Sequence, residues 1–355
     1  MTYVHNLSPF AIQLWDGFGI RWYGLAYLAG FVLGYYLIVF MNRRSQILLK
    51  EDKLPDYVTY MALGVMVGGR LGYCLFYAPE LLVSFDGLFP YWGLLKVNEG
   101  GMASHGGIIG VMTACWLYSR KHKIAFLHVL DLVALGGAIA FFFGRLANFV
   151  NGELYGRAVT GTLSWAVKFP QEMALWSTTE LARISGAVQA LGEYKSRDGQ
   201  VISLNPTVWQ GWLNTFHDFL SRERVHEVLE AMILAVQQGN EAVASQLAPF
   251  LTARHPSQLY QALLEGLLVF LLLMWVWRKP QKPGVVGGWF GVGYSVARII
   301  GEQFRVPDAH IGFELFGLTR GQWLSIAFLA FSIGYLVMAY RRQAPFYGGW
   351  LKKQN

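Results

Sequence analysis

The chain has 355 residues, of which 54% are hydrophobic and 14% are charged, and its mean hydropathy is +0.34. Roughly a quarter of the residues of a soluble globular domain are charged, so this composition excludes an ordinary soluble protein and indicates one embedded in lipid. The formal net charge is +7. Because the basic residues lie between apolar segments, we interpret this charge as a membrane-insertion signal and expect no nucleic-acid partner.

Seven apolar segments follow one another along the chain. Each approaches the length of ~20 residues that a helix needs to cross a bilayer. They are residues 22–41, 57–77, 102–119, 127–144, 257–277, 284–304 and 322–340. The sequence therefore predicts an all-α membrane protein with about seven transmembrane helices. Forty glycines suit such a protein, and Gly64, Gly68 and Gly72 have the four-residue spacing of closely packed membrane helices.

The connections between these segments predict the orientation. Three of them and the C-terminal tail fall on one side of the membrane and hold fourteen basic residues against three acidic ones. The basic residues are Arg43, Arg44, Lys50, Lys53, Arg120, Lys121, Lys123, Arg278, Lys279, Lys282, Arg341, Arg342, Lys352 and Lys353. Basic residues are enriched on the cytoplasmic side, so we predict the N-terminus outside and the C-terminus in the cytoplasm. Residues 1–21 have no basic region before an apolar run, so no cleaved signal peptide is expected.

One long extramembrane excursion separates the fourth span from the fifth. Up to about Pro170 it is predicted as loop with a short strand at 162–169, and from about Glu180 to Phe250 as polar and helical. The helical prediction rests on the spacing of Val225, Leu229, Ile233 and Val236. We therefore expect three regions: helices 1–4 with the catalytic motifs (1–160), a small extracytoplasmic cap with a helical insertion (161–253), and helices 5–7 with a cytoplasmic tail (254–355).

Ionisable residues within a membrane span are costly and mark function by default. In the seven-span topology most of them, with the polar Asn148, fall in or next to the outer half of the bilayer: Tyr23, Arg70, His105, Arg145, Asn148, Glu153, His255, Tyr260, Glu265, Arg298, Glu302 and Arg305. Asp131 and His128 lie near the inner side, and we interpret them as structural. No P-loop, GxGxxG or HExxH motif is present, and Cys74 and Cys115 both fall within spans. We therefore expect no metal site and no organic cofactor.

Each of these residues has a structural alternative. Arg70 could bond to loop carbonyls rather than to a ligand. Arg298, Glu302 and Arg305 share one face of a continuous helix and could form an internal ion pair, although two arginines to one glutamate leave a cation for an anionic ligand. His105 could be a hydrogen-bonded structural histidine, but glycines on both sides would let a substrate approach it. Arginines at this depth suit a lipid phosphate, because guanidinium offers a planar fork to phosphate oxygens.

Six stretches of the sequence carry a family resemblance, in order, over most of the chain outside the cap. They are residues 21–27 (RWYGLAY), 68–73 (GGRLGY), 100–107 (GGMASHGG), 144–157 (GRLANFVNGELYGR), 254–260 (RHPSQLY) and 298–308 (RIIGEQFRVPD). With these motifs the chain resembles the bacterial prolipoprotein diacylglyceryl transferases. The fourteen-residue stretch is the most specific of the six.

The resemblance implies an inner-membrane enzyme of lipoprotein maturation. Such an enzyme moves the diacylglyceryl group of phosphatidylglycerol onto the lipobox cysteine of a prolipoprotein signal peptide, forms a thioether and releases glycerol phosphate. Its motifs imply a central set, His105, Arg145, Asn148, Gly156 and Tyr23, and a supporting set, Tyr294, Arg298, Glu302, Arg305 and Glu153. Of these we expect His105, Arg145 and Arg298 to be catalytic and the others to bind substrate.

The implied chemistry matches these residue types. A thiol with a pKa of about 8.5 needs a base to become a thiolate, for which we expect His105, and the leaving phosphate needs fixed cations, for which we expect Arg145 and Arg298. His105 could instead bond to the headgroup glycerol. A transporter or flippase for an anionic lipid is the alternative from another class. Transporters place their sites near the bilayer midplane between internal repeats, and this sequence shows no repeat.

Overall fold

The computed structural model describes residues 2–15, 18–45, 47–85, 90–97, 100–307 and 312–350. Lys352 and Lys353 of the predicted cytoplasmic tail, and Asp308 at the end of the last matching stretch, lie outside these residues. The chain divides into two compact units. A bundle unit comprises residues 27–143, 264–298 and 323–355, and a mixed unit comprises residues 1–26, 144–263 and 299–322.

Helices occupy all seven segments predicted to span the membrane. Within the described residues, five are long and apolar enough to cross a bilayer: α1 (Trp22–Arg44), α2 (Leu54–Phe76) with the turn before it, α4 (Phe126–Val150), the helix Ser257–Trp277 and α13 (Arg320–Arg341). The other two are α3 (Ser104–His122) and the 17-residue α12 (Val285–Gly301). The prediction of a helical, multi-pass membrane protein is thus confirmed.

The helix Ser257–Trp277, which occupies the fifth of the seven predicted spans, is not a regular α-helix. It begins as α10 (Ser257–Gln261), widens into a π-helical stretch (Ala262–Leu268) and continues as α11 (Val269–Trp277). The widened turn packs against α4, since a Cβ added at Gly266 would lie 2.6 Å from Phe142 Cα. A π-helical turn shifts the side chains that follow it around the helix axis and often occurs at functional sites.

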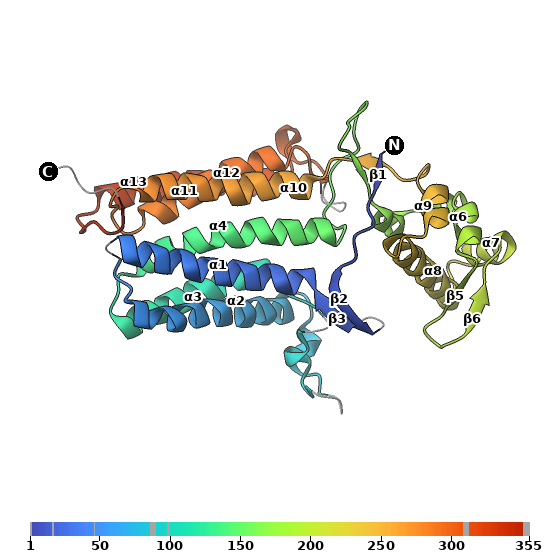
Figure 1. Ribbon diagram of the computed structural model, residues 1–355, viewed down its shortest axis with the longest axis horizontal. Helices are drawn as coiled ribbons and strands as arrows, with labels where there is room; N and C mark the ends of the chain where they lie inside the picture. Colours follow the sequence, from blue (N-terminus) through green and yellow to red (C-terminus); the bar gives the residue numbers. More distant parts are fainter. Residues whose placement is uncertain are drawn as a thin grey trace. The chain divides into compact units, whose positions relative to one another are not determined.

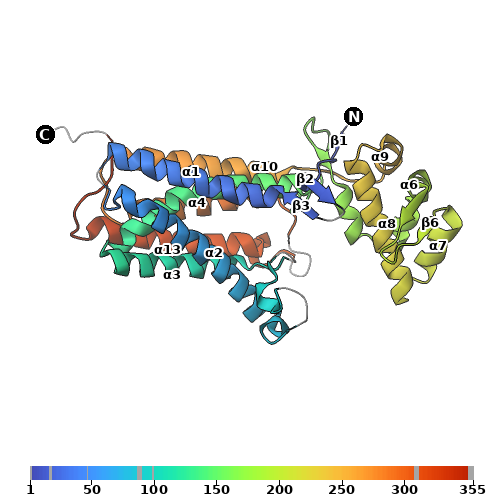
Figure 2. The ribbon, with the colours of Figure 1, turned by 60° about the horizontal axis from the view of Figure 1, so that its bottom comes forward.

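In the bundle unit the helices lie side by side with their axes roughly aligned (Figures 1 and 2). Glycines set the spacing of α2 and α3. A Cβ added at Gly68 would lie 2.7 Å from Gly110 Cα, and one at Gly72 would lie 2.7 Å from Gly106 Cα. Side chains larger than glycine cannot fit at these distances, so the predicted close approach at the Gly64, Gly68 and Gly72 repeat is confirmed.

Asp131 of α4 is buried at the start of α12. Its two carboxylate oxygens each accept a backbone hydrogen bond of 2.7 Å, one from Gly284 and one from Gly287. Backbone N–H groups at a helix N-terminus have no partner within the helix, and the helix dipole favours a negative charge there. Asp131 therefore fixes α12 against α4, as the structural interpretation predicted.

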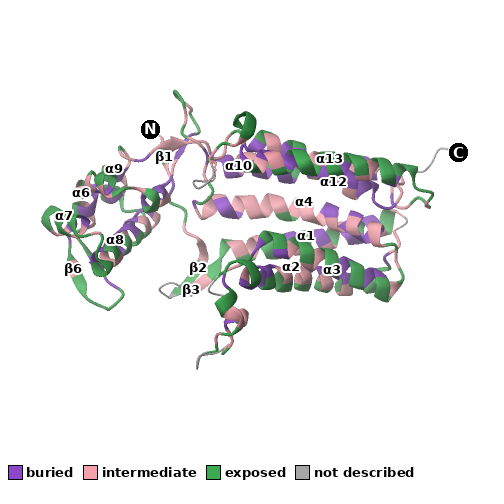
Figure 3. Ribbon diagram, turned by 180° about the vertical axis from the view of Figure 1, so that it is seen from behind, coloured by how far each residue is buried: buried purple, intermediate pink, exposed green. Residues whose placement is uncertain are grey.

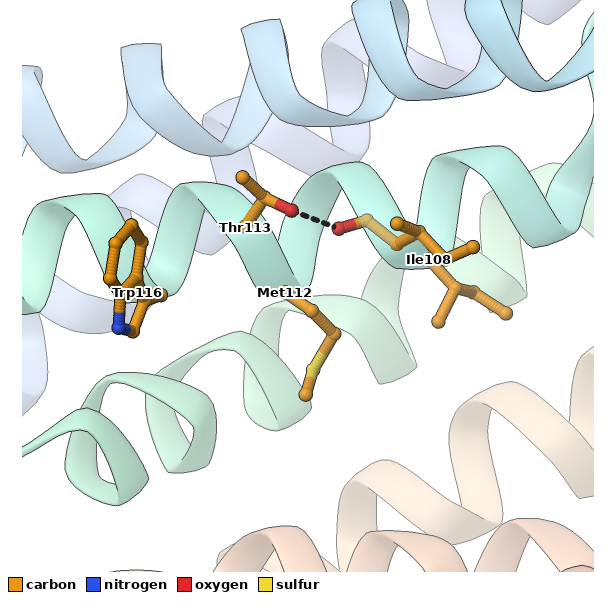
Figure 4. A pocket seen from close by; sticks show the side chains of 5 residues that line it. Ile108, Met112, Thr113 and Trp116 are labelled. Atoms are coloured by element: carbon orange, nitrogen blue, oxygen red, sulfur yellow. Dashed lines mark hydrogen bonds between the residues drawn. The ribbon is translucent and has the colours of Figure 1, made fainter.

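Exposed residues recur along the helices of the bundle unit (Figure 3). Many of them are large and apolar, among them Leu63, Ile109, Leu324 and Phe331. On α3 a shallow hollow is lined by Ile108, Ile109, Met112, Thr113 and Trp116, whose side chains project from the helix (Figure 4). Thr113 Oγ1 donates to the Ile109 carbonyl of the same helix at 2.9 Å. Its hydroxyl is therefore satisfied within its own helix.

The mixed unit contains short strands as well as helices. A parallel pair, β1 (Tyr3–Val4) and β4 (Val167–Lys168), is extended by antiparallel β7 (Ala253–Arg254). The hairpin of β2 (Phe10–Trp15) and β3 (Phe18–Arg21) leads directly into α1. The strand predicted at 162–169 is thus only the two residues of β4, and the N-terminal hairpin is an addition to the predicted all-α architecture.

The segment inserted before α10 folds around its own apolar core. Its helices are α5 (Thr178–Ala182), α6 (Ser185–Leu191), α7 (Pro206–Asn214), α8 (Phe219–Gln237) and α9 (Glu241–Leu247), with a hairpin of β5 (Glu193–Lys195) and β6 (Val201–Ser203). On α8, Val225, Leu229 and Val236 are buried and Ile233 packs against them. The helix predicted from their spacing is therefore confirmed.

Candidate functional site

Three residues that the resemblance marks are joined through one phenol in the mixed unit. Tyr23, the second residue of α1, bonds to Asn148 Oδ1, and its hydroxyl lies 2.5 Å from Glu153 Oε1. The Tyr23 hydroxyl is the donor and the Asn148 and Glu153 oxygens are both acceptors within its reach. The three side chains therefore form one hydrogen-bonded set.

The last turns of α4 carry Arg145 and Asn148. They are three residues apart and therefore lie on the same side of the helix. Asn148 is buried, whereas Arg145 is half-buried. The helix extends to Val150, beyond the predicted end of the span at residue 144. Both side chains are thus held on a regular helix rather than on the loop that follows it.

Gly156 lies where two backbone segments meet. Its N–H donates to the His255 carbonyl at 3.0 Å, and it pairs with Arg305 in an isolated β-bridge. A Cβ added here would lie 2.5 Å from the Phe304 carbonyl oxygen and 2.9 Å from His255 Cβ. Any larger residue would push these segments apart, so the structure gives Gly156 a packing role whatever its contact with substrate.

The ion pairs of the sixth helix differ from those predicted. Helix α12 ends at Gly301, so Arg298 does not share a continuous helix face with Glu302 and Arg305. Arg298 Nη1 donates to Glu265 Oε1 at 3.1 Å, whereas Arg305 lies 3.9 Å from Glu302. Glu265 is thus a second acid beside these two arginines, supplied by another helix.

Glu265 is the functional candidate that the sequence did not single out. Its partner cannot be found from a local sequence pattern, because Arg298 lies 33 residues away on another helix. Glu265 is fully buried on the π-helical stretch, and the Arg298 side chain is 13% exposed. The available sequence signal is the glutamate itself, because a carboxylate in the middle of an apolar helix needs a cation nearby.

Tyr294 lies one turn before Arg298 on α12. Its ring stacks on Phe290 at 5.8 Å and approaches Phe141 of α4 at 5.1 Å. Because residues four apart on a helix are neighbours, Tyr294 and Arg298 lie on the same side of α12. The aromatic contacts fix the tyrosine ring beside the arginine.

His105 occupies the first turn of α3 and is exposed. The neighbouring Gly106 is buried against α2, where an added Cβ would lie 2.8 Å from Gly72 Cα. The Ala103 N–H donates to the Gly69 carbonyl at 2.9 Å and ties the residues before the helix to α2. The backbone of His105 is therefore fixed on both sides while its imidazole remains accessible.

Arg70 has the structural role that the sequence left open. Its guanidinium donates to the carbonyls of Gly93, Leu94 and Gly100 at 2.6 to 2.8 Å, and more weakly to Gly101 at 3.1 Å. The side chain is buried. These bonds hold the connection between α2 and α3, from which α3 and His105 follow.

The bundle unit also holds an apolar cavity of about 170 Å³. Its walls include glycines of α1 and α4, namely Gly30, Gly34, Gly136 and Gly137, with Tyr27, Tyr35, Tyr57 and aliphatic side chains completing the lining. The four glycines make room between the side chains of the two helices. An apolar lining of this kind suits a hydrocarbon chain.

Comparison with known proteins places these features in a family. The model of the family described as prolipoprotein diacylglyceryl transferase matches residues 9–338. A phosphatidylglycerol–prolipoprotein diacylglyceryl transferase of Bdellovibrio bacteriovorus is 46% identical over 98% of this chain and 97% of its own length. Proteins of the same name from Idiomarina loihiensis and Xanthomonas euvesicatoria are 34% and 36% identical, each over at least 96% of this chain and 95% of their own length. The chain belongs to the prolipoprotein diacylglyceryl transferase family.

Proposed function

We propose that this protein transfers the diacylglyceryl group of phosphatidylglycerol to the lipobox cysteine of prolipoproteins in the bacterial inner membrane. The observation that carries the proposal is the hydrogen-bonded set of Tyr23, Asn148 and Glu153 in a chain 46% identical to a protein named for this reaction. Three residues implied in substrate binding, 125 and 130 positions apart in sequence, meet at one phenol.

In the proposed reaction His105 takes the proton of the cysteine thiol. The thiolate sulfur attacks the glycerol carbon that carries the phosphate ester, the carbon–oxygen bond breaks, and a carbon–sulfur thioether bond forms. Glycerol phosphate leaves with the bonding electron pair. Arg145 and Arg298 stabilise the charge that develops on the phosphate, while Tyr23, Asn148, Glu153, Tyr294, Glu302 and Arg305 orient the lipid headgroup around them. No metal or organic cofactor takes part in these steps.

The apolar cavity of the bundle unit supports a lipid substrate. It would accept a segment of one acyl chain between the glycines of α1 and α4. Burial of each methylene of such a chain contributes about 0.8 kcal/mol to binding. Binding energy of this kind, remote from the reacting carbon, would hold the headgroup in place for attack.

The proposal includes seven membrane spans with the N-terminus and the inserted segment 161–253 outside. Arginines and lysines in the last turns of α1, α3 and α13 support this orientation. Cysteines placed at Lys50, Lys121 and Lys282 should resist labelling from outside intact spheroplasts, whereas one at Lys195 should react. Both native cysteines are fully buried and should give little background. External labelling at any of the first three positions would disprove the seven-span topology.

The transfer itself is tested with purified protein, acyl-labelled phosphatidylglycerol and a lipobox peptide. The peptide should gain the mass of a diacylglyceryl group, with one equivalent of glycerol phosphate released. A peptide with serine in place of the cysteine should stay unmodified. Lipid movement across vesicle membranes without peptide modification would favour the flippase alternative and exclude the transferase.

A further inference from the structure

Two side chains in the first turn of α10 hold the backbone next to Glu153. Gln258 Nε2 donates to the Glu153 carbonyl at 2.6 Å, and Ser257 Oγ donates to the Leu154 carbonyl at 3.0 Å. Both side chains are completely buried. Consecutive carbonyls of one loop are thus bonded by consecutive side chains of one helix, which fixes the position of this loop.

The loop between α4 and β4 needs such support because its backbone is strained. Gly152 and Leu154, on either side of Glu153, both have left-handed backbone angles, with φ of +68° and +54°. Glycine adopts this conformation freely, but for a leucine it costs on the order of 1–2 kcal/mol. A residue like Leu154 keeps this conformation only where surrounding contacts hold it there.

The strained backbone conformation determines where the Glu153 side chain points. It directs the carboxylate toward Tyr23, so that Glu153 Oε1 lies 2.5 Å from the phenol oxygen and 3.3 Å from Asn151 Nδ2. If the loop relaxed, the carboxylate would leave the phenol, and Tyr23 would keep only its bond to Asn148.

From this geometry we infer that Gln258 is a positioning residue, which holds the Glu153 carboxylate on Tyr23 by fixing the strained Glu153–Leu154 backbone. The inference rests on the proposed function and adds a residue that acts through Glu153. Gln258 donates only from Nε2. Its Oε1 is buried and makes no hydrogen bond to the described part of the chain. The bond to the Glu153 carbonyl is therefore the one hydrogen bond that the Gln258 side chain makes within the described residues.

The chain offers a matched control in the same helix. Gln261 lies one turn further along α10, is also fully buried, and neither its amide nitrogen nor its oxygen has a hydrogen-bond partner among the described residues. Gln258→Met and Gln261→Met therefore make the same change of size and polarity at neighbouring sites. Only Gln258→Met removes a bond to the loop.

The first experiment compares transfer kinetics of these two variants. A misplacement of about 1 Å at a reacting centre costs on the order of 10²-fold in rate, so Gln258→Met should lose about 10- to 100-fold in kcat with KM for phosphatidylglycerol nearly unchanged. Gln261→Met should retain normal kinetics. Leu154→Asn, which tolerates the left-handed conformation, should recover part of the loss in the Gln258→Met background. Equal kinetics of the two methionine variants would overturn the inference.

Gln258→Glu separates positioning from general destabilisation. A buried carboxyl has a raised pKa because desolvation disfavours its charge, and in its protonated form it can donate to the Glu153 carbonyl. The transfer rate of Gln258→Glu should therefore approach that of wild type at low pH and fall below it as pH rises, whereas Gln258→Met should show no such pH-dependent fall relative to wild type. If Gln258→Met also has a lowered melting temperature, the pH profile of Gln258→Glu is the deciding measurement. A pH-dependent fall supports the inference, and a rate that does not change with pH relative to wild type overturns it.

Backbone hydrogen exchange supplies a readout that does not depend on activity. A peptide covering 148–157 should exchange faster in Gln258→Met than in wild type or Gln261→Met. If wild-type protein transfers no lipid, the proposed function fails, while the exchange still reports whether Gln258 holds the loop. Unchanged exchange in Gln258→Met would disprove that step on its own.

Discussion

Arg298 Nη1 donates to Glu265 Oε1 at 3.1 Å, and Glu265 is completely buried on the π-helical turn of the fifth membrane helix. The arginine proposed to bind phosphate is therefore already paired with an anion. A phosphate reaching Arg298 would share its guanidinium with Glu265. The fork geometry allows this, because guanidinium has five N–H donors on more than one edge.

This pair predicts that Arg298→Ala combines two effects. Removing one partner of a buried pair costs about 3–5 kcal/mol, since the other charge is left uncompensated. Arg298→Ala should therefore lower the melting temperature as well as abolish transfer. The double variant Arg298→Met/Glu265→Leu removes both charges and should recover most of the stability but none of the transfer. Thermal unfolding in detergent and transfer rates measure the two effects. Recovery of transfer in the double variant would leave Arg298 a structural residue only.

Arg145 should not tolerate replacement by lysine. The guanidinium can contact two phosphate oxygens at once, which an ammonium group cannot. We expect Arg145→Lys to lose at least about 10²-fold in transfer rate, the order lost when one fixed donor at a developing charge is removed. The measurement is kcat with labelled phosphatidylglycerol. Near-normal kcat for Arg145→Lys would remove the two-point contact from the mechanism.

His105 should act as a base rather than as a ligand for the headgroup glycerol. General-base catalysis contributes about 10²–10⁴-fold, so His105→Gln should lose that much rate while retaining lipid binding. An amide can replace a histidine hydrogen bond but cannot accept the thiol proton at neutral pH. The test is transfer rate against pH for both proteins. A nearly normal rate for His105→Gln, with the acid limb of the profile retained, would contradict the assignment.

The inserted helices should be dispensable for chemistry. Residues 177–250 supply most of an apolar core that Met173 and Leu251 complete, and none of the proposed catalytic or substrate-binding residues belongs to this segment. The ion pair of Glu172 with Arg254 at 2.5 Å would remain to hold the ends. Replacement by a Gly/Ser linker should leave transfer to a lipobox peptide within about tenfold of wild type. Loss of peptide modification in a variant that still binds phosphatidylglycerol would assign peptide binding to this segment.

His5 should make stability depend on pH. Its ring is buried, its Nε2 donates to the Phe149 carbonyl at 2.7 Å, and burial lowers its pKa from 6.5 to about 4. Between these values the unfolded chain binds a proton that the folded chain does not, so stability falls as pH drops from about 6.5 toward 4, by on the order of 1–3 kcal/mol. His5→Gln keeps a donor that cannot titrate. The melting temperature of His5→Gln should fall less than that of wild type over this range; identical profiles would refute the assignment.

The sequence predicted the helices, the family and most of the candidate residues. Helix positions follow from the length of each apolar run, and length is a local property that the bilayer fixes. The spacing of Gly64, Gly68 and Gly72 likewise predicted a close helix contact, because small residues four apart line one helix face. Motifs such as the fourteen residues from Gly144 were sufficient to predict the family without the structure.

Partners between helices were decided by the tertiary structure. The sequence offered Glu302, four residues later, as the acid for Arg298, and gave no sign that Glu265 pairs with Arg298 from another helix. A charged residue in an apolar span predicts that a partner lies nearby, but it does not indicate which helix supplies that partner. The support of Glu153 by Gln258, 105 residues later, was equally beyond a sequence pattern. Local patterns determine which residues are helical and which are costly to bury, whereas the packing of helices determines which of those residues meet.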